Sequence, residues 1–132
     1  MKSNNLEEEF VKKFIIKNKQ ERILWELRSS KKRESVFWRF AGTEILKKEC
    51  LNDLGYMPQK ELEGYLLKYV RSRCVYFIGN DYIGEISLEE AVAQMEMGSI
   101  GIIYCGDGIG YYQGEQGING HTPRCLLKES IM

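Results

Sequence analysis

The stretch IGIIYCGDGIGYYQ, residues 100–113, decides the fold. Ile100 to Cys105 is an apolar run rich in β-branched and aromatic side chains, which predicts a buried strand. Gly106-Asp107-Gly108 predicts a tight turn, because Asp and Gly tolerate the positive φ angles that a short hairpin needs. Ile109 to Gln113 predicts the returning strand. Ile100 to Cys105 is therefore expected to be the most buried strand, and residues 100–113 are expected to form a hairpin of a largely antiparallel sheet.

Further strands are expected on both sides of this hairpin. Cys74 to Ile78 reads as a buried strand that ends at Gly79-Asn80-Asp81, and Tyr82 to Ile86 as a short partner strand or an extended loop. Ser87-Leu88-Glu89-Glu90 is a capping box that opens an inserted helix, which Gly98 ends. After a glycine-rich loop, Arg124 to Lys128 predicts a final strand at an edge of the sheet.

The first half of the chain reads as helix. Apolar residues at three- and four-residue spacing predict helices over 6–15, 21–28, 31–49 and 58–70, with a break at 17–20 and a turn at 52–55. Trp25 and Trp38 are expected to pack in the core. We expect one α+β domain over residues 1–132, in which a layer of three to four N-terminal helices packs on a small, mostly antiparallel sheet with one inserted helix.

Charge is divided between the two halves. Residues 1–73 hold seventeen Lys and Arg and eleven Asp and Glu, a net of +6, whereas residues 74–132 hold two and eight, a net of −6. Each half can therefore attract a partner of the opposite sign.

Several classes of protein are excluded or disfavoured. The chain has no run of eighteen apolar residues, and Met1 to Glu9 lacks the apolar core of a secretory signal, so we expect a cytoplasmic protein that does not span a membrane. The four cysteines form no C-x-x-C pair and there is one histidine, so neither a metal site nor a disulfide is expected. Cys74 and Cys105 are expected to be small buried hydrophobes.

No complete catalytic or phosphate-binding motif is present, and no cofactor is expected. Gly106 to Gly110 resembles a glycine-rich phosphate loop, but Tyr111-Tyr112 continues as strand and no Gly-Lys-Ser/Thr follows, which favours the hairpin. An enzyme of unrecognised type that uses His121 with a carboxylate such as Glu115 is the lowest-ranked hypothesis.

The acidic half offers a candidate docking surface for a basic protein. Carboxylates flank the predicted strands, and tyrosines interleave with them; tyrosine supplies contact area with a polar tip and is enriched at interface hot spots. The predicted partner-binding residues are Asp81, Tyr82, Glu85, Asp107, Tyr111, Tyr112 and Glu115. The predicted edge strand, Arg124 to Lys128, offers a second way to bind, by pairing with a partner strand.

The basic half suggests nucleic-acid binding as the alternative. Phosphates need several cations, and aromatic rings stack on unpaired bases. The residues that would serve are Arg28, Lys31, Lys32, Arg33 and Arg39. Glutamates interspersed among them are typical of solvated helix faces, which weakens this alternative.

The stretch ERILWELRSSKKR, residues 21–33, followed by Trp38-Arg39-Phe40, is similar to the opening of small bacterial proteins without assigned chemistry. In size and build, the whole chain resembles bacterial toxin-immunity proteins, including those of contact-dependent growth inhibition. Because immunity proteins share no general motif, the resemblance assigns no functional residue. It implies a cytoplasmic, non-enzymatic protein that binds one cognate toxin tightly and blocks it, and the acidic half implies a toxin with a basic surface, such as a nuclease.

Overall fold

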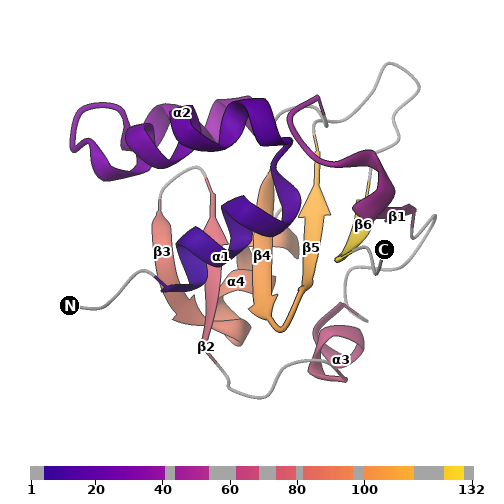
Figure 1. Ribbon diagram of the computed structural model, residues 1–132. Coiled ribbons are helices and arrows are strands. Elements are labelled where there is room, and N and C mark those ends of the chain that lie inside the picture. The colour runs from indigo at the N-terminus through magenta and orange to yellow at the C-terminus, as the bar shows by residue number, and fades with distance from the viewer. Residues whose placement is uncertain are drawn as a thin grey trace, which may run out of the picture.

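The computed structural model describes residues 5–40, 44–53, 62–68, 74–79, 82–96, 100–114 and 124–129. One six-stranded sheet, antiparallel at every pairing, forms its centre with the strand order β1-β6-β5-β4-β2-β3 (Figure 1). This confirms the predicted α+β class with an antiparallel sheet. The strands are β1 (Leu51–Asp53), β2 (Cys74–Ile78), β3 (Ile83–Ser87), β4 (Gly101–Gly106), β5 (Ile109–Gln113) and β6 (Arg124–Lys128).

Helices cover both faces of the sheet. The N-terminal helices lie across one face, and α4, inserted between β3 and β4, lies behind the other (Figure 1). Helix α3 packs against α4. The helices are α1 (Asn5–Phe14), α2 (Lys17–Arg28), the 3₁₀ helices η1 (Arg33–Phe40) and η2 (Lys48–Cys50), α3 (Leu62–Leu67) and α4 (Leu88–Glu96).

Alternate residues of the central strands therefore enter two separate cores. On β2, Tyr76 and Ile78 pack toward the N-terminal helices, while Val75 and Phe77 pack with α4. Strands that are buried on both faces read as continuous apolar runs rather than as alternating ones. This explains why β2 and β4 were recognisable from sequence.

Residues 31–49 do not form the single helix that the apolar spacing predicts. They contain η1, and after the gap at 41–43 there is a turn at Glu44 and Ile45. Leu46 then forms an isolated bridge with Ile15 at the end of α1, and η2 follows. The Ile16 N–H donates to the Ile45 carbonyl (2.9 Å) and the Lys47 N–H to the Phe14 carbonyl (2.8 Å). Valine and aromatic residues crowd the start of this segment and are weak helix formers, so tertiary contacts decide its shape.

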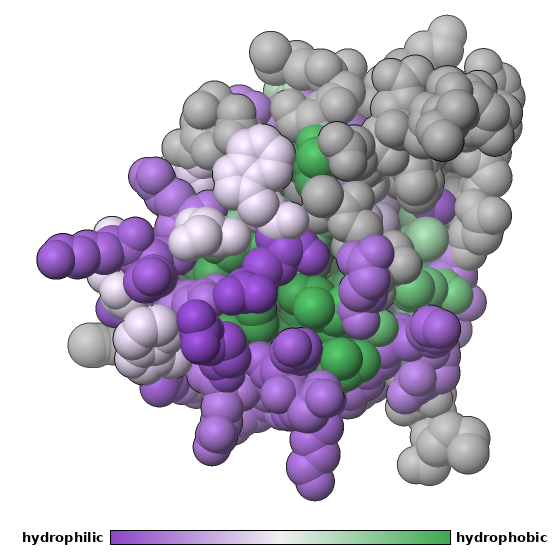
Figure 2. Space-filling view, turned by 90° about the horizontal axis from the view of Figure 1, so that it is seen from above, coloured by the Kyte–Doolittle hydropathy of each residue, from purple (hydrophilic) through white to green (hydrophobic). Residues whose placement is uncertain are grey.

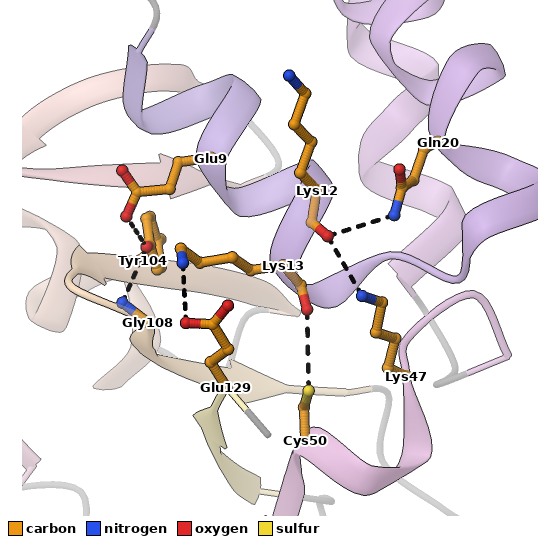
Figure 3. Close-up of polar contacts among 9 residues, drawn as sticks. All are labelled: Glu9, Lys12, Lys13, Gln20, Lys47, Cys50, Tyr104, Gly108 and Glu129. Atoms are coloured by element: carbon orange, nitrogen blue, oxygen red, sulfur yellow. Dashed lines mark hydrogen bonds and ion pairs between the residues drawn. The ribbon is translucent and has the colours of Figure 1, made fainter. Parts of the chain in front are cut away.

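Helix α1 ends against side chains that come later in the chain (Figure 3). The Lys12 carbonyl accepts from Gln20 Nε2 (3.3 Å) and Lys47 Nζ (3.2 Å), and the Lys13 carbonyl accepts from Cys50 Sγ (3.8 Å). These donors satisfy carbonyls that have no partner within a helix end. The break between the first two helices accordingly falls at residues 15–16, and the predicted break at 17–20 is wrong because α2 starts at Lys17.

Strand β6 is not an edge strand, contrary to the sequence prediction. It pairs with β5 on one side and with β1 on the other, where Leu51 lies opposite Leu127. The prediction of a turn at 52–55 is wrong for Asn52 and Asp53, which belong to β1, while residues 54 and 55 lie outside the described part. Because β1 occupies its outer side, β6 cannot pair with a partner strand.

The edge strand β3 is covered by side chains. The Gly79 N–H donates to the Tyr82 carbonyl (2.9 Å), which makes these two a hydrogen-bonded pair. Since pairs alternate in an antiparallel ladder, the carbonyls of Ile83 and Glu85 point away from β2. Arg33 Nη2 donates to the first of them and the Tyr82 hydroxyl to the second, each at 3.1 Å. Such cover discourages strand addition at this edge.

The capping box at the start of α4 is confirmed for the hydrogen bond that the Ser87 side chain accepts. The Glu90 N–H donates to Ser87 Oγ (3.1 Å), as predicted. The Glu90 carboxylate also accepts from the Ser87 hydroxyl (3.3 Å). The Ser87 side chain therefore fixes where β3 stops and α4 begins.

The Gly110→Ala substitution is expected to lower the free energy of unfolding by about 3 kcal/mol. A Cβ at this position of β5 would lie 2.6 Å from the Ile103 carbonyl oxygen, a main-chain atom of the central strand β4. Urea unfolding followed by far-UV circular dichroism measures the effect. The control is Gly64→Ala in α3, where a Cβ meets nothing within 4 Å; it should stabilise by about 0.5–1 kcal/mol. Equal stability of both variants would contradict this packing.

Candidate interaction surface

Two tyrosines of the predicted docking surface are core residues. Tyr111 and Tyr112 are 1% and 0% exposed, so their prediction as surface anchors is wrong. The Tyr111 hydroxyl donates to Gln113 Oε1 (2.7 Å) and the Tyr112 hydroxyl to the Phe40 carbonyl (2.9 Å). Burial raises the pKa of Tyr111 and keeps it neutral. The reason is that helices cover both faces of the sheet, so β5 has no solvent face.

The two acidic members of that surface that the structure describes lie on different elements. Glu85 is exposed on the edge strand β3, whereas Asp107 is exposed at the β4–β5 turn, and β2 lies between β3 and β4. Tyr82 is 48% exposed. Asp81 and Glu115, like His121, lie outside the described residues.

Acidic and basic halves instead meet beside the β4–β5 turn (Figure 3). Lys13 Nζ of α1 pairs with Glu129 Oε1 at 2.8 Å, and this bond, with the nearby Glu9 and Asp107 carboxylates, raises the pKa of Lys13. The Tyr104 hydroxyl bonds to Glu9 and accepts from the Gly108 N–H. A lysine of the basic half thus compensates part of the negative charge that was expected to attract a partner.

The four cysteines differ in exposure. No disulfide links the four, all of which lie in the described part. Cys105 is partly buried against the core beside α4, and burial raises the pKa of its thiol to about 12. Cys74 is exposed, so its prediction as a buried side chain is wrong; its thiol lies 3.6 Å from Glu85 Oε1.

Trp25 and Trp38 are the largest exposed side chains described. They are 54% and 62% exposed, so their prediction as core residues is wrong. Both lie on the surface made by α2 and η1, which we call the tryptophan face: Arg22, Trp25, Glu26, Trp38 and Arg39. Figure 2 looks down on the α2 side of the molecule, where pale and green patches lie among purple side chains.

One buried carboxylate joins the two parts of the tryptophan face. The Glu26 side chain is 3% exposed. It accepts from Arg22 Nε (2.9 Å) and from Arg39 Nε and Nη2 (2.7 and 2.5 Å). The Arg22 guanidinium lies over the Trp25 ring, 5.4 Å from its centroid, and Trp38 packs edge-to-face on Phe37 at 4.8 Å. The two tryptophans are therefore held by contacts on the protein side and still face solvent.

The sequence of α2 explains this placement. Ile23 and Leu27 are four residues apart and buried, so they define the inner stripe of the helix. Trp25 lies about 200° around the helix from Ile23, because each residue turns by about 100°, and so it projects outward. The spacing of Ile23 and Leu27 was the signal that could have placed Trp25 on the surface.

Acid is expected to weaken the tie at Glu26. Hydrogen bonds from Arg39, then from Arg22, lower the pKa of this carboxyl from 4.5 to about 2 although burial opposes them. A lowered pKa stabilises the folded state above pH 4.5, and that stabilisation is lost as the pH falls through about 2. Since Arg22 is largely exposed, we expect about 2–3 kcal/mol.

Urea unfolding between pH 7 and pH 2 measures this contribution. The stability difference between wild type and Glu26→Gln should be largest at pH 7 and should vanish near pH 2. Glu34→Gln, at an exposed carboxylate of η1, is the control and should show no such convergence. A difference that is independent of pH would refute the ion-paired carboxylate.

The residues predicted for nucleic-acid binding divide into two groups. Arg28 pairs with Glu8 (2.5 Å), Arg33 with Glu7 (3.0 Å), and Arg39 with Glu26. Lys31 and Lys32, in contrast, are exposed, and neither forms an ion pair with another described residue. The lysines are thus the cations of this set that remain for a partner.

The described residues contain no group of three His, Cys, Asp or Glu side chains that could hold a metal ion. Over the same part of the chain, no helix is long and apolar enough to cross a membrane. Comparison of the chain with protein-family models, curated proteins and solved structures found no match.

Proposed function

We propose that this chain is a non-enzymatic protein-binding inhibitor, an immunity protein of the cytoplasm that neutralises a cognate bacterial toxin by tight binding. The resemblance in size and build motivates the toxin as partner. The observation that supports binding is the exposure of both tryptophans on the tryptophan face. We therefore assign the partner to this face and not to the acidic residues that the sequence suggested.

Exposed tryptophans beside arginines are typical of binding hot spots. Trp and Arg are enriched among the few side chains that carry most of the binding energy of an interface. A ring that is already held on one side loses little conformational freedom on binding. Trp25 under Arg22 and Trp38 on Phe37 meet this condition.

The test uses the product of the neighbouring reading frame as partner. The two proteins should co-purify, and cells that express the partner should survive when this chain is present. Trp25→Ala/Trp38→Ala should weaken binding about a hundredfold or more, because two hot-spot side chains are removed. If this double variant keeps both binding and protection, the assignment to the tryptophan face is overturned.

A matched control tests the surface predicted from sequence. Tyr82→Ala/Glu85→Gln/Asp107→Asn removes its exposed described members and leaves the tryptophan face intact. This triple variant should bind as the wild type does. If it fails to bind while the tryptophan variant binds normally, the acidic surface is the interface.

Nucleic-acid binding is the second candidate, favoured by the exposure of Lys31 and Lys32 on the segment between the exposed Trp25 and Trp38. Titration with single-stranded DNA at two salt concentrations tests it. Steep salt dependence that weakens in Lys31→Ala/Lys32→Ala would support it, since each phosphate contact releases counterions. Absence of binding at low salt would remove it.

A further inference from the structure

We infer that the partner surface bound by the tryptophan face is acidic, a protein surface rich in Asp and Glu. This inference rests on the proposed function and reverses the sign of the partner that the sequence predicted. It follows from where the unpaired charges lie, which the order of residues along the chain did not reveal.

The positive charge of the N-terminal half is concentrated in the segment that carries the tryptophan face. Residues 17–40, which run from the start of α2 to the end of η1, hold eight Lys and Arg and three Glu, a net of +5. This segment therefore accounts for most of the +6 of residues 1–73. Glu7 and Glu8 of α1 pair with Arg33 and Arg28 and reduce the net charge at this segment to +3. The charge that remains steers acidic surfaces toward it.

The arginines and lysines of this segment have different roles. All four arginines are committed to carboxylates of this chain, namely Glu7, Glu8 and Glu26. The four lysines are exposed and, within the described residues, have no ion pair. They are Lys17, Lys19, Lys31 and Lys32. The arginines thus hold the face in place, and the lysines are the charges that meet the partner.

The same contacts favour an acidic protein over a nucleic acid. Base stacking is limited on these rings, because the Arg22 guanidinium already lies over one face of Trp25 and Phe37 packs against Trp38. Arginines that are bound to glutamates cannot neutralise phosphates without leaving a carboxylate bare. Glu21 and Glu34 are exposed on the same segment and repel a phosphate backbone.

Intrinsic fluorescence reports on this face alone, because Trp25 and Trp38 are the only tryptophans of the chain. The probes are poly-L-glutamate, poly-L-lysine and an oligothymidylate of the same charge as the polyglutamate. Each is titrated at about 0.02 M and about 0.3 M sodium chloride, which brackets strong and weak screening. Polyglutamate should change the tryptophan emission at low salt, and polylysine should not.

Charge variants test which lysines are responsible. Lys31→Glu/Lys32→Glu should weaken polyglutamate binding by about tenfold or more, as should the higher salt concentration. Lys48→Glu/Lys128→Glu changes the net charge equally at exposed positions on η2 and β6, and should bind as the wild type does. Equal loss in both variants, tighter binding of oligothymidylate, or no response to polyglutamate would overturn the inference.

The natural partner separates this inference from the proposed function. If the neighbouring gene product binds in a tryptophan-dependent manner but is unaffected by salt and by Lys31→Glu/Lys32→Glu, the acidic partner is wrong and the proposed function stands. If polyglutamate binds through the two lysines while that gene product neither binds nor is neutralised, the proposed function is wrong and the charge of the face stands.

Discussion

Replacing Phe10 by alanine should lower the free energy of unfolding by about 4 kcal/mol, because it empties the centre of the larger core. Phe10 is fully buried, and its ring centroid lies 5.8–6.1 Å from those of four other rings, on α1, η1, β2 and β4. These rings are Phe14, Phe40, Tyr76 and Tyr104. One side chain thus joins two helices to two strands, and its loss removes both buried area and ring contacts.

Urea unfolding followed by far-UV circular dichroism measures this loss. Tryptophan emission is unsuitable, because both tryptophans are exposed in the folded protein. Trp25→Ala removes a larger ring from the surface and should cost about 1 kcal/mol or less. If the two variants were equally stable, Phe10 would not occupy the centre of the core.

Replacing Arg33 by methionine should destabilise the protein by about 3 kcal/mol, although the residue lies near the surface. Its guanidinium pairs with the buried Glu7 carboxylate at 3.0 Å. It also donates to the carbonyls of Leu27 (2.6 Å) and Ile83 (3.1 Å), which links η1 to α2 and β3. Without it, the Tyr76 hydroxyl, at 2.9 Å, is the described donor that remains for Glu7.

Burial and the neighbouring Glu7 carboxylate raise the pKa of Tyr76, so this hydroxyl stays a neutral donor and cannot replace a cation. Thermal or urea unfolding of Arg33→Met measures the loss, and Glu7→Gln/Arg33→Met should recover part of it because no buried charge is left unpaired. Arg28→Met is the matched control: its pair with Glu8 is exposed and should contribute about 0.5 kcal/mol or less. A similar loss in both arginine variants would contradict the role of burial.

The second half of the chain could be predicted closely from its sequence. Strands that are buried on both faces are recognisable in the sequence as apolar runs. Gly106, Asp107 and Gly108 all adopt the positive φ that the turn requires. The first half was harder to predict. Ile45 and Leu46 fit a helical stripe as well as an extended segment, and only their pairing with the end of α1 decides between the two.

The candidate site could not be predicted from the net charge of each half of the chain. Net charge by segment does not say which charges are already paired, and the pairs that matter join residues 7 and 33 or 26 and 39. Tyr111 and Tyr112 illustrate the same limit. Their strand was predicted correctly, but whether a helix covers its second face depends on the position of α4.

The place of β1 at the edge of the sheet has a consequence during translation. Leu51 pairs with Leu127, so the ribosome must make more than seventy further residues before this strand finds its neighbour. At roughly 5–20 residues per second, that delay lasts several seconds. Strands β2, β4 and β5, which supply side chains to the core under the N-terminal helices, are made within this delay, so the β1 edge of the sheet closes after the centre.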